Sequence, residues 1–171
     1  MTMRFYLGTH HADWLARAAV PLFVVRATLA NRKSLPRAIA PWALDSGGFT
    51  ELQRHGRWTV QPVDYAREFR RFRDEIGMLE WAAPMDWMCE PIVLRGGSGA
   101  HGIRFAGTGL SVEEHQKRTI ENYLELRHIA PDLPFIPVLQ GWSIADYWRH
   151  VEAYQSAGVE LADLPLVGVG T

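Results

Sequence analysis

The amino-acid sequence predicts an α/β fold in which parallel strands alternate with helices. Short apolar runs are separated by longer amphipathic segments, which is the pattern of βα units. Several of these runs are apolar on both faces, as buried parallel strands are. The chain has 171 residues, of which 47% are hydrophobic. This is enough for one core and too short for two, so we expect a single domain over residues 1–171.

Six segments have the composition of strands. Each is a short apolar run bounded by turn residues or by a helical pattern. In chain order they are Arg4–Leu7, Pro21–Val25, Trp42–Leu44, Leu79–Pro84, Phe135–Leu139 and Leu166–Val169.

Three amphipathic segments between the strands predict helices. Pro62–Ile76 carries apolar residues at three- and four-residue spacing, and its initial proline suits the first turn. Ser111 has a glutamate three positions later, the pattern of a capping box, and opens a helix that stops before Pro131. Ser143 opens a third helix, which ends near Gly158.

The alternation is compatible with a doubly wound sheet or with a (β/α) barrel, and composition does not separate the two. An eight-stranded barrel needs roughly 250 residues. This chain ends on the apolar strand pattern LPLVGVGT, with no following helix. If the fold is a barrel, we therefore expect an incomplete one of about six strands that lacks its C-terminal part.

Charge and cysteine content exclude several classes of protein. Eighteen Lys and Arg against nineteen Asp and Glu give a net charge of −1, so a nucleic-acid partner must be held by a local patch. The single cysteine, Cys89, forms no internal disulfide and no multi-cysteine zinc site. No apolar run approaches the ~18 residues of a membrane span, and the first residues lack a signal-peptide pattern. We expect a cytoplasmic protein with no metal, no cofactor and no membrane contact.

The sharpest local motif is ALDSGGF, which places a carboxylate at the end of a predicted strand. Asp45 is placed to act, because sites assemble at the carboxyl ends of parallel strands. The two glycines allow a close backbone approach to a ligand. The residues that follow the aspartate are candidate contacts: Ser46, Gly47, Gly48 and Phe49. In the alternative interpretation, Asp45 and Ser46 only cap a helix that begins near Thr50.

A second carboxylate follows another predicted strand in the motif APMDWMCEP. Asp86 is the candidate here, and its alternative role is a cap or an ion pair with an arginine. Cys89, in the same motif, is more typical of a small core residue than of a nucleophile.

A third predicted strand ends in VLQGW. Gln140 supplies an amide donor and acceptor, Gly141 permits close approach, and Trp142 offers a stacking face. An aspartate and a glutamine facing one pocket suit a purine-like base, on which Phe49 or Trp87 could stack. Alternatively, Gln140 is an ordinary strand-end residue.

Three further patterns carry weaker signals. Gly168 and Gly170 at the last strand suit backbone contact with a ligand, although a turn explains them equally well. The segment GSGAHG matches a dinucleotide fingerprint only as letters, because no strand directly precedes it and no helix opens at its third glycine. A basic stretch is a candidate for contact with a nucleic-acid backbone and consists of Arg26, Arg32, Lys33 and Arg37.

Four motifs in the same order are shared with a known superfamily. LDSGGF, an aspartate with a nearby cysteine, a strand ending in QG and a strand ending in GVG resemble the tRNA-guanine (queuine) transglycosylases. FYLGTH, WALDSGGFTEL, EWAAPMDWMCEP and PFIPVLQGW resemble the DpdA-type branch, the DNA 7-deazaguanine-modification proteins of phages and bacteria. The resemblance covers essentially the whole chain.

The resemblance implies a TIM-like (β/α) barrel enzyme that exchanges guanine in a polynucleotide for a 7-deazaguanine base such as preQ0. The implied partners are that base and a nucleic acid, DNA rather than tRNA. Asp45 corresponds to the catalytic aspartate, usually assigned general-base work, and Phe49 to the aromatic that stacks on the base. Asp86 and Gln140 correspond to the residues that read the guanine edge. Gly168 or Gly170 corresponds to the glycine whose backbone contacts the base.

The chain departs from the superfamily in two respects. The resemblance implies a covalent aspartate nucleophile on a later strand, beyond Thr171, and the cysteine-rich zinc site of the tRNA enzymes is missing. Two alternatives therefore stay open. One is a fragment or split subunit that binds a base or nucleic acid and needs a second chain to complete the barrel. The other is a hydrolase of small glycosides or nucleosides that uses Asp45 and Asp86.

Overall fold

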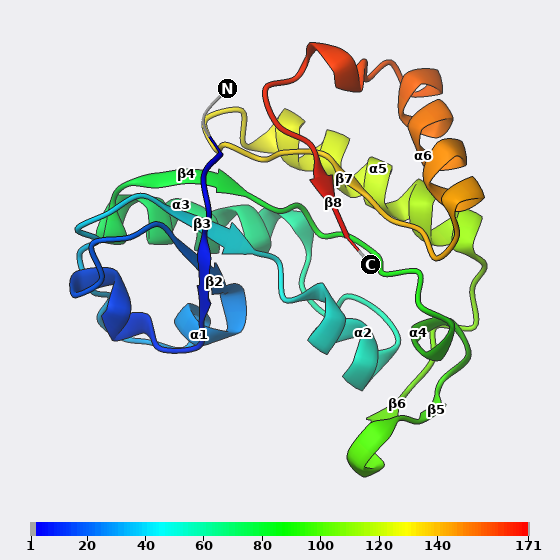
Figure 1. Cartoon of the computed structure of the whole chain (residues 1–171), viewed down its shortest axis with the longest axis horizontal. Helices are drawn as coiled ribbons and strands as arrows, with labels where there is room; N and C mark the ends of the chain where they lie inside the picture. Colours follow the sequence, from blue (N-terminus) through cyan, green and yellow to red (C-terminus); the bar gives the residue numbers. More distant parts are fainter. Residues whose placement is uncertain (1–2, 171) are drawn as a thin grey trace.

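The computed structural model describes residues 3–170 and shows a mixed α/β architecture (Figure 1). Its main sheet is parallel throughout, and the order of its strands follows the order of the chain. The four strands are β1 (Leu7–Thr9), β2 (Leu22–Val25), β3 (Trp42–Asp45) and β4 (Leu79–Ala82). The predicted α/β class with parallel strands is confirmed.

The chain-ordered arrangement continues beyond the main sheet. Phe135 forms an isolated parallel bridge with Ala82, the last residue of β4. The chain then enters β7 (Val138–Leu139), which pairs in parallel with β8 (Gly168–Val169). Each parallel strand after β1 thus lies beside the parallel strand that precedes it along the chain.

All six predicted strands are present, although the structure shifts their boundaries. The first begins at Leu7, later than predicted, because the ladder starts where the Leu7 N–H donates to the carbonyl of Pro21. The fifth begins at Val138, also later than predicted, since Pro137 has no N–H to donate and interrupts the ladder.

A short antiparallel hairpin, which was not predicted, lies outside the parallel strands. It consists of β5 (Gly97–Ser98) and β6 (Arg104–Phe105). The segment GSGAHG forms its first strand and tip, and no helix opens at Gly102. The interpretation that this segment matches a dinucleotide fingerprint only by chance is therefore confirmed.

The three predicted helices are α3 (Pro62–Ile76), α5 (Val112–Ile129) and α6 (Ile144–Ser156). Their predicted caps are present, since Ser111 accepts a hydrogen bond from the Glu114 N–H and Ser143 forms a capping box with Asp146. The shorter helices are α1 (Arg26–Ala30), α2 (Gly48–His55), α4 (Pro91–Arg95) and the 3₁₀ helices η1 (Ala12–Ala16), η2 (Ala100–Gly102) and η3 (Leu161–Asp163). Of the shorter helices, only α2 was anticipated, in the alternative interpretation of Asp45 and Ser46 as caps of a helix near Thr50; the others span too few residues to show a periodicity.

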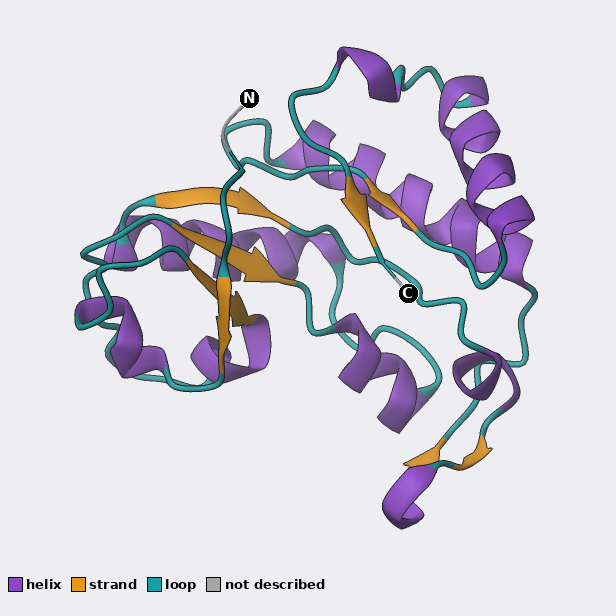
Figure 2. Ribbon diagram, in the orientation of Figure 1, coloured by secondary structure: helices purple, strands orange, loops and turns teal. Residues whose placement is uncertain are grey.

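The helices form an outer layer and leave the other side of the strands facing a hollow. Figure 2 shows α3, α5 and α6 together on one side of the strands, and α5 packs against both α3 and α6. The core between α3 and the sheet is rich in fully buried aromatic and aliphatic residues: Trp42, Leu44, Tyr65, Phe69 and Phe72. No helix in the described part of the chain is long and apolar enough to cross a membrane.

Candidate functional site

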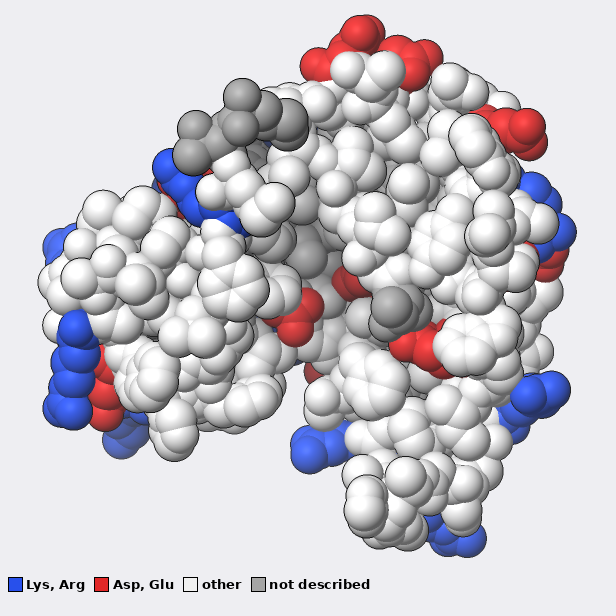
Figure 3. All heavy atoms as spheres, in the orientation of Figure 1, with Lys and Arg blue, Asp and Glu red and all other residues white. Residues whose placement is uncertain are grey.

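A cavity of about 350 Å³ lies at the carboxyl ends of the parallel strands. This volume falls in the range of small-molecule sites. Figure 3 shows the hollow between the part of the molecule that carries β1–β4 and the part that carries β7 and β8, with acidic side chains at its centre. The polar residues that line the cavity are Asp45, Asp86, Glu90 and Gln140.

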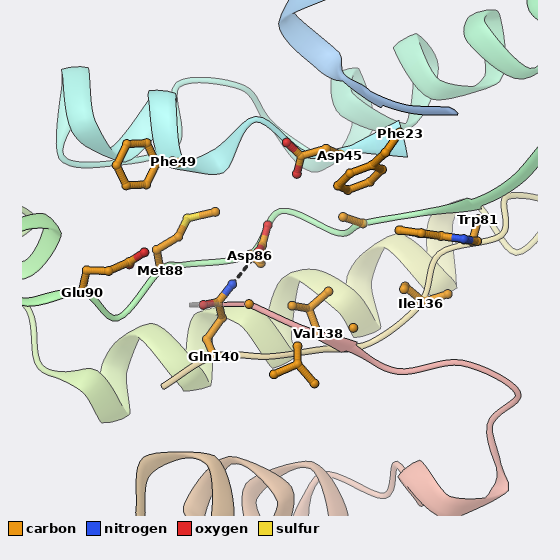
Figure 4. A pocket seen from close by; sticks show the side chains of 14 residues that line it. Phe23, Asp45, Phe49, Trp81, Asp86, Met88, Glu90, Ile136, Val138 and Gln140 are labelled. Carbon is orange, nitrogen blue, oxygen red and sulfur yellow. Dashed lines mark hydrogen bonds between the residues drawn. The ribbon is translucent and has the colours of Figure 1, made fainter. Parts of the chain in front are cut away.

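Asp86 is the most constrained of these polar groups. It follows β4, is 6% exposed, and accepts hydrogen bonds with both carboxylate oxygens. The Ser46 hydroxyl donates to Oδ1 over 2.6 Å, and the Gln140 Nε2 donates to Oδ2 over 2.6 Å (Figure 4). Burial raises the pKa of Asp86 from its ordinary 3.8 to about 6, although the hydrogen bond from Ser46 opposes the shift. No arginine forms an ion pair with Asp86 among the described residues, so that alternative role is wrong.

Asp45 ends β3 and points into the same cavity (Figure 4). Burial raises the pKa of its carboxyl, while the backbone N–H groups of Gly47 and Ser46 counteract the shift. The negative charge of Asp45 also contributes to the raised pKa of Asp86. Two carboxyl groups with raised pKa values thus share one cavity, an arrangement typical of sites that move protons.

Gln140 joins the carboxylate pair from the end of β7. Its Nε2 is bound by Asp86, whereas its Oε1 is buried and has no hydrogen-bond partner among residues 3–170. Its backbone is fixed as well, because its N–H donates to Nδ1 of His150 and its carbonyl accepts from Gln116. A ligand that supplied an N–H would satisfy the one unpaired oxygen of this amide.

Two glycines, one in β8 and one just after it, line the cavity, and the second lies against this amide. A Cβ on Gly170 would lie 2.3 Å from the Gln140 Nε2, so any larger residue would displace the amide. A Cβ on Gly168 would lie 3.0 Å from Val138. The predicted glycines therefore permit a close backbone approach, and what they approach directly is the Gln140 and Val138 side chains.

The apolar wall of the cavity is a row of side chains across neighbouring strands that was not predicted from the sequence. Phe23 pairs in register with Ala43, which pairs in register with Trp81, so the three side chains stand on one face of the sheet. The Phe23 and Trp81 ring centroids are 5.2 Å apart across the small alanine. The row was not predicted because it depends on the register of strands far apart in sequence. Further lining residues not predicted are Ala83, Met88, Glu90, Ile136, Val138 and Val169.

Six predicted site residues line the cavity: Asp45, Phe49, Asp86, Gln140, Gly168 and Gly170. The other four do not line it and lie behind its wall. Ser46 is fully buried and binds Asp86, and it also accepts from the Gly48 N–H. Gly47 adopts a left-handed φ of 74° before α2, and Gly141 packs against Asp146. These residues support the residues that line the cavity, and the structure does not support direct contact between them and a ligand.

The structure also bears on three further predictions, which concern Trp87, Cys89 and the basic stretch. Trp87 is no stacking face for the cavity, because it is buried against His115 and Arg118. Cys89 is a buried residue whose pKa burial raises to about 12, which confirms its interpretation as a core residue. Two of the four residues of the basic stretch form ion pairs, Arg26 with Glu68 and Arg32 with Asp13, so the role of the stretch in contact with a nucleic-acid backbone stays a prediction.

The parallel strands and the polar groups at their carboxyl ends define an α/β protein with a cavity at its strand ends, where proteins of this class bind ligands. The family model described as DpdA, DeoxyPurine in DNA protein A, matches residues 1–171. The chain therefore belongs to the DpdA family, which supports a role in DNA modification and a transferase activity in general. A search of curated proteins finds no match.

Proposed function

We propose that this chain carries the base-exchange site of a DNA guanine transglycosylase, which replaces guanine by a 7-deazaguanine base such as preQ0. The observation that supports it best is the convergence of Asp45, Asp86 and Gln140 from three strand ends on one cavity. Membership of the DpdA family favours DNA over tRNA as the polynucleotide.

In this proposal the pair of Asp86 and Gln140 recognises the edge of the base. A carboxylate accepts hydrogen bonds from ring and exocyclic N–H groups of a guanine-like ring, and an amide offers both a donor and an acceptor. The aromatic wall of Phe23 and Trp81 and the ring of Phe49 suit a flat heterocycle. A base in a duplex must first be flipped out of the stack to enter such a pocket.

Asp45 would carry the proton in the exchange. The reaction breaks the bond between C1′ and N9 of the guanine nucleotide and forms the same bond to the incoming base. The departing guanine gains a proton at N9, and the incoming base loses one. A carboxyl with a raised pKa in the cavity can give and take this proton. Retention also requires a covalent carboxylate nucleophile, which the resemblance to the transglycosylases implies on a later strand of the barrel.

We further propose that the whole chain forms one unit, an arc of a TIM-like (β/α) barrel. The support is topological: apart from the hairpin, the strands β1–β4, β7 and β8 are parallel and follow one another in chain order, with the bridge between Ala82 and Phe135 joining the two groups. A doubly wound sheet would instead reverse its order at a switch point. The site at the carboxyl ends of the strands is also where barrel enzymes bind substrate.

The test combines base binding with base exchange. Calorimetry with free preQ0 measures binding, and mass spectrometry of digested DNA measures incorporation of the base into a duplex. We expect the chain to bind preQ0. In the assembled enzyme, with the later strand that carries the nucleophile present, we expect Asp45→Asn to lower incorporation by roughly 100-fold or more without unfolding the protein. Asp163→Asn, at an exposed aspartate outside the cavity, is the matched control.

Each alternative has its own outcome. Base binding without incorporation by the assembled enzyme would favour a non-catalytic subunit that only binds the base. Release of guanine without an incoming base would favour a hydrolase. A folded protein that binds neither preQ0 nor guanine would contradict the proposed function.

A further inference from the structure

Four arginines around α2, α4 and the hairpin lack the ion pairs that occupy many other arginines of this protein. They are called the basic rim and are Arg54, Arg57, Arg95 and Arg104, at or just after the ends of α2 and α4 and on the hairpin. All four are exposed, and none forms an ion pair in the described part of the chain. The arginines of α3, by contrast, are paired with carboxylates on or beside that helix.

The chain segment that carries half of this rim has no acidic residue. From Pro91 to Val112 it contains six glycines and no aspartate or glutamate. The rim is therefore a local positive surface on a protein whose net charge is −1. Figure 3 shows basic side chains below the hollow, over the region of α2 and of the hairpin. Such a local patch is what binding to a polyanion requires.

Two grooves are lined by rim arginines, and the first of them borders the cavity. The first, of about 640 Å³, includes Phe49 and Glu90, which also line the cavity, together with Arg95 and Trp142. The second, of about 400 Å³, lies between α2 and the hairpin and includes Arg54 and Arg104. Glu90 is the acidic residue that lines the first groove, and it also lines the cavity.

The hairpin is attached firmly to α2, so the rim arginines are held in place relative to the cavity. The Ala106 N–H donates to the carbonyl of Gln53 over 2.9 Å. The rings of Phe49 and Phe105 meet edge to face with centroids 5.7 Å apart. A Cβ on Gly56 would lie 2.4 Å from the Gly107 carbonyl oxygen, so the end of α2 abuts the hairpin directly.

Trp142 adds an aromatic surface at the mouth of the cavity. It follows Gln140 by two residues, lines the first groove, and is 61% exposed. Its backbone is fixed, because its N–H donates to Asp146 at the start of α6. An exposed indole in the same groove as Arg95, a guanidinium without an ion pair, is a combination with which proteins bind exposed nucleotides, by stacking on bases and by contact with phosphates.

We propose that the basic rim and Trp142 bind the DNA strand that flanks the exchanged base. The rim arginines contact phosphates, and Trp142 stacks on a base next to the flipped nucleotide. This proposal rests on the proposed function, because it takes the cavity as the site of the flipped base. It assigns the polynucleotide contacts to a surface that does not include the basic stretch at residues 26–37.

The rim is tested by fluorescence anisotropy with a labelled DNA duplex. The double variant Arg54→Glu/Arg104→Glu is compared with Arg17→Glu/Lys33→Glu, which changes the net charge equally at exposed residues without ion pairs. We expect the rim variant to lose at least about tenfold in affinity and to reduce the slope of log affinity against log salt by about 2. The control variant should bind DNA as the unchanged protein does.

Trp142→Ala is tested in the same assay against Trp148→Ala, an equally exposed tryptophan on α6 outside the grooves. We expect Trp142→Ala to lower the affinity by between about 5-fold and 100-fold, and Trp148→Ala to leave it unchanged. All variants should bind free preQ0 like the unchanged protein, because none of these residues lines the cavity.

The two proposals fail in different ways. If the unchanged protein binds neither preQ0 nor guanine, the proposed function fails. If it binds preQ0 but the rim and control variants bind DNA equally, the proposal for the rim is overturned. Binding of an acidic protein at this surface, with no DNA binding, would overturn it as well.

Discussion

Asp45 and Asp86 carry the same side chain and line the same cavity, yet their surroundings suit them to different tasks. Both oxygens of Asp86 already accept hydrogen bonds, from Ser46 and from Gln140. Asp45 is half-buried and is held by backbone N–H groups alone. A carboxylate fixed at both oxygens suits recognition, and a freer one with a raised pKa suits proton transfer.

The affinity for the base should depend on pH through Asp86. Its pKa is raised to about 6 by burial, and only the ionised form accepts hydrogen bonds with both oxygens. We expect the affinity for free preQ0 to rise as the pH increases through about 6 and then to level off. Calorimetry between about pH 5 and about pH 7.5 measures this dependence.

The variant Asp86→Asn should lower the affinity roughly tenfold or more at neutral pH and should remove the increase near pH 6, because a charge-assisted hydrogen bond is lost. Asp163→Asn should retain both the affinity and the pH dependence. If Asp86→Asn showed the same pH dependence as the unchanged protein, another group would have to be titrating.

Helix α6 holds the strand that delivers Gln140. His150 accepts the hydrogen bond of the Gln140 N–H through Nδ1, and the Tyr154 hydroxyl donates to the carbonyl of Val138. The two side chains stack with ring centroids 4.9 Å apart, and both are fully buried. The position of Gln140 at the end of β7 therefore depends on a helix that does not itself line the cavity.

Acid should weaken this attachment through His150. Burial lowers the pKa of His150 from 6.5 to about 4, so the folded protein disfavours the protonated ring. The stability that neutral His150 contributes is fully present above about pH 6.5 and is lost as the pH falls towards 4. The loss is on the order of 2–3 kcal/mol.

Urea unfolding of His150→Gln, compared with the unchanged protein across this pH range, measures that contribution. The variant should lose less stability on acidification, whereas His128→Gln, at an exposed histidine of α5, should not differ from the unchanged protein. Asp86 acts in the opposite direction, because its raised pKa makes folding less favourable as the pH rises from about 4 to about 6. Equal pH dependence in both histidine variants would contradict the role given to His150.

The elements that could be predicted from sequence are those with a local signal. Pro62 and a regular apolar spacing define α3 to the residue, and apolar runs locate every parallel strand. The hairpin of β5 and β6 has neither signal, because glycines dominate it and its pairing brings only two residues of each strand together. Its existence follows from contacts with α2 that lie far away in sequence.

The candidate site could be predicted in part for the same reason. Strand ends are visible in the sequence, so Asp45, Asp86 and Gln140 could be identified as neighbours. The direction of the side chains after a strand is not visible. Trp87 turns away from the cavity because its N–H is bound by Thr119 of α5, and this contact depends on tertiary packing.

At the scale of the whole molecule, an aromatic cluster joins the main sheet to the strands that follow it. Phe135 is 4% exposed, and its ring lies 5.5 Å from that of Phe69 and 6.1 Å from that of Tyr65 on α3. The same residue makes the parallel bridge to Ala82. The position of β7 relative to β4, and thus of Gln140 relative to Asp86, depends on this contact.

Phe135→Ala should therefore destabilise the protein by about 3–5 kcal/mol, because it leaves a cavity in a closely packed cluster. Urea unfolding measures the change, and calorimetry with preQ0 should show a parallel loss of affinity. Phe5→Ala, at a phenylalanine that is 75% exposed, should change the stability by less than about 0.5 kcal/mol. A loss below about 1 kcal/mol for Phe135→Ala would show that the two groups of strands are held together by other contacts.

The row of Phe23, Ala43 and Trp81 has a practical consequence. Trp81 is an indole in the wall of the cavity, with Phe23 on one side and Tyr6 at its edge, 5.5 Å between ring centroids. A flat heterocycle that enters the cavity must displace water from this ring. The emission of an indole responds to the polarity of its surroundings, so Trp81 gives the protein a built-in optical signal of whether its cavity is filled.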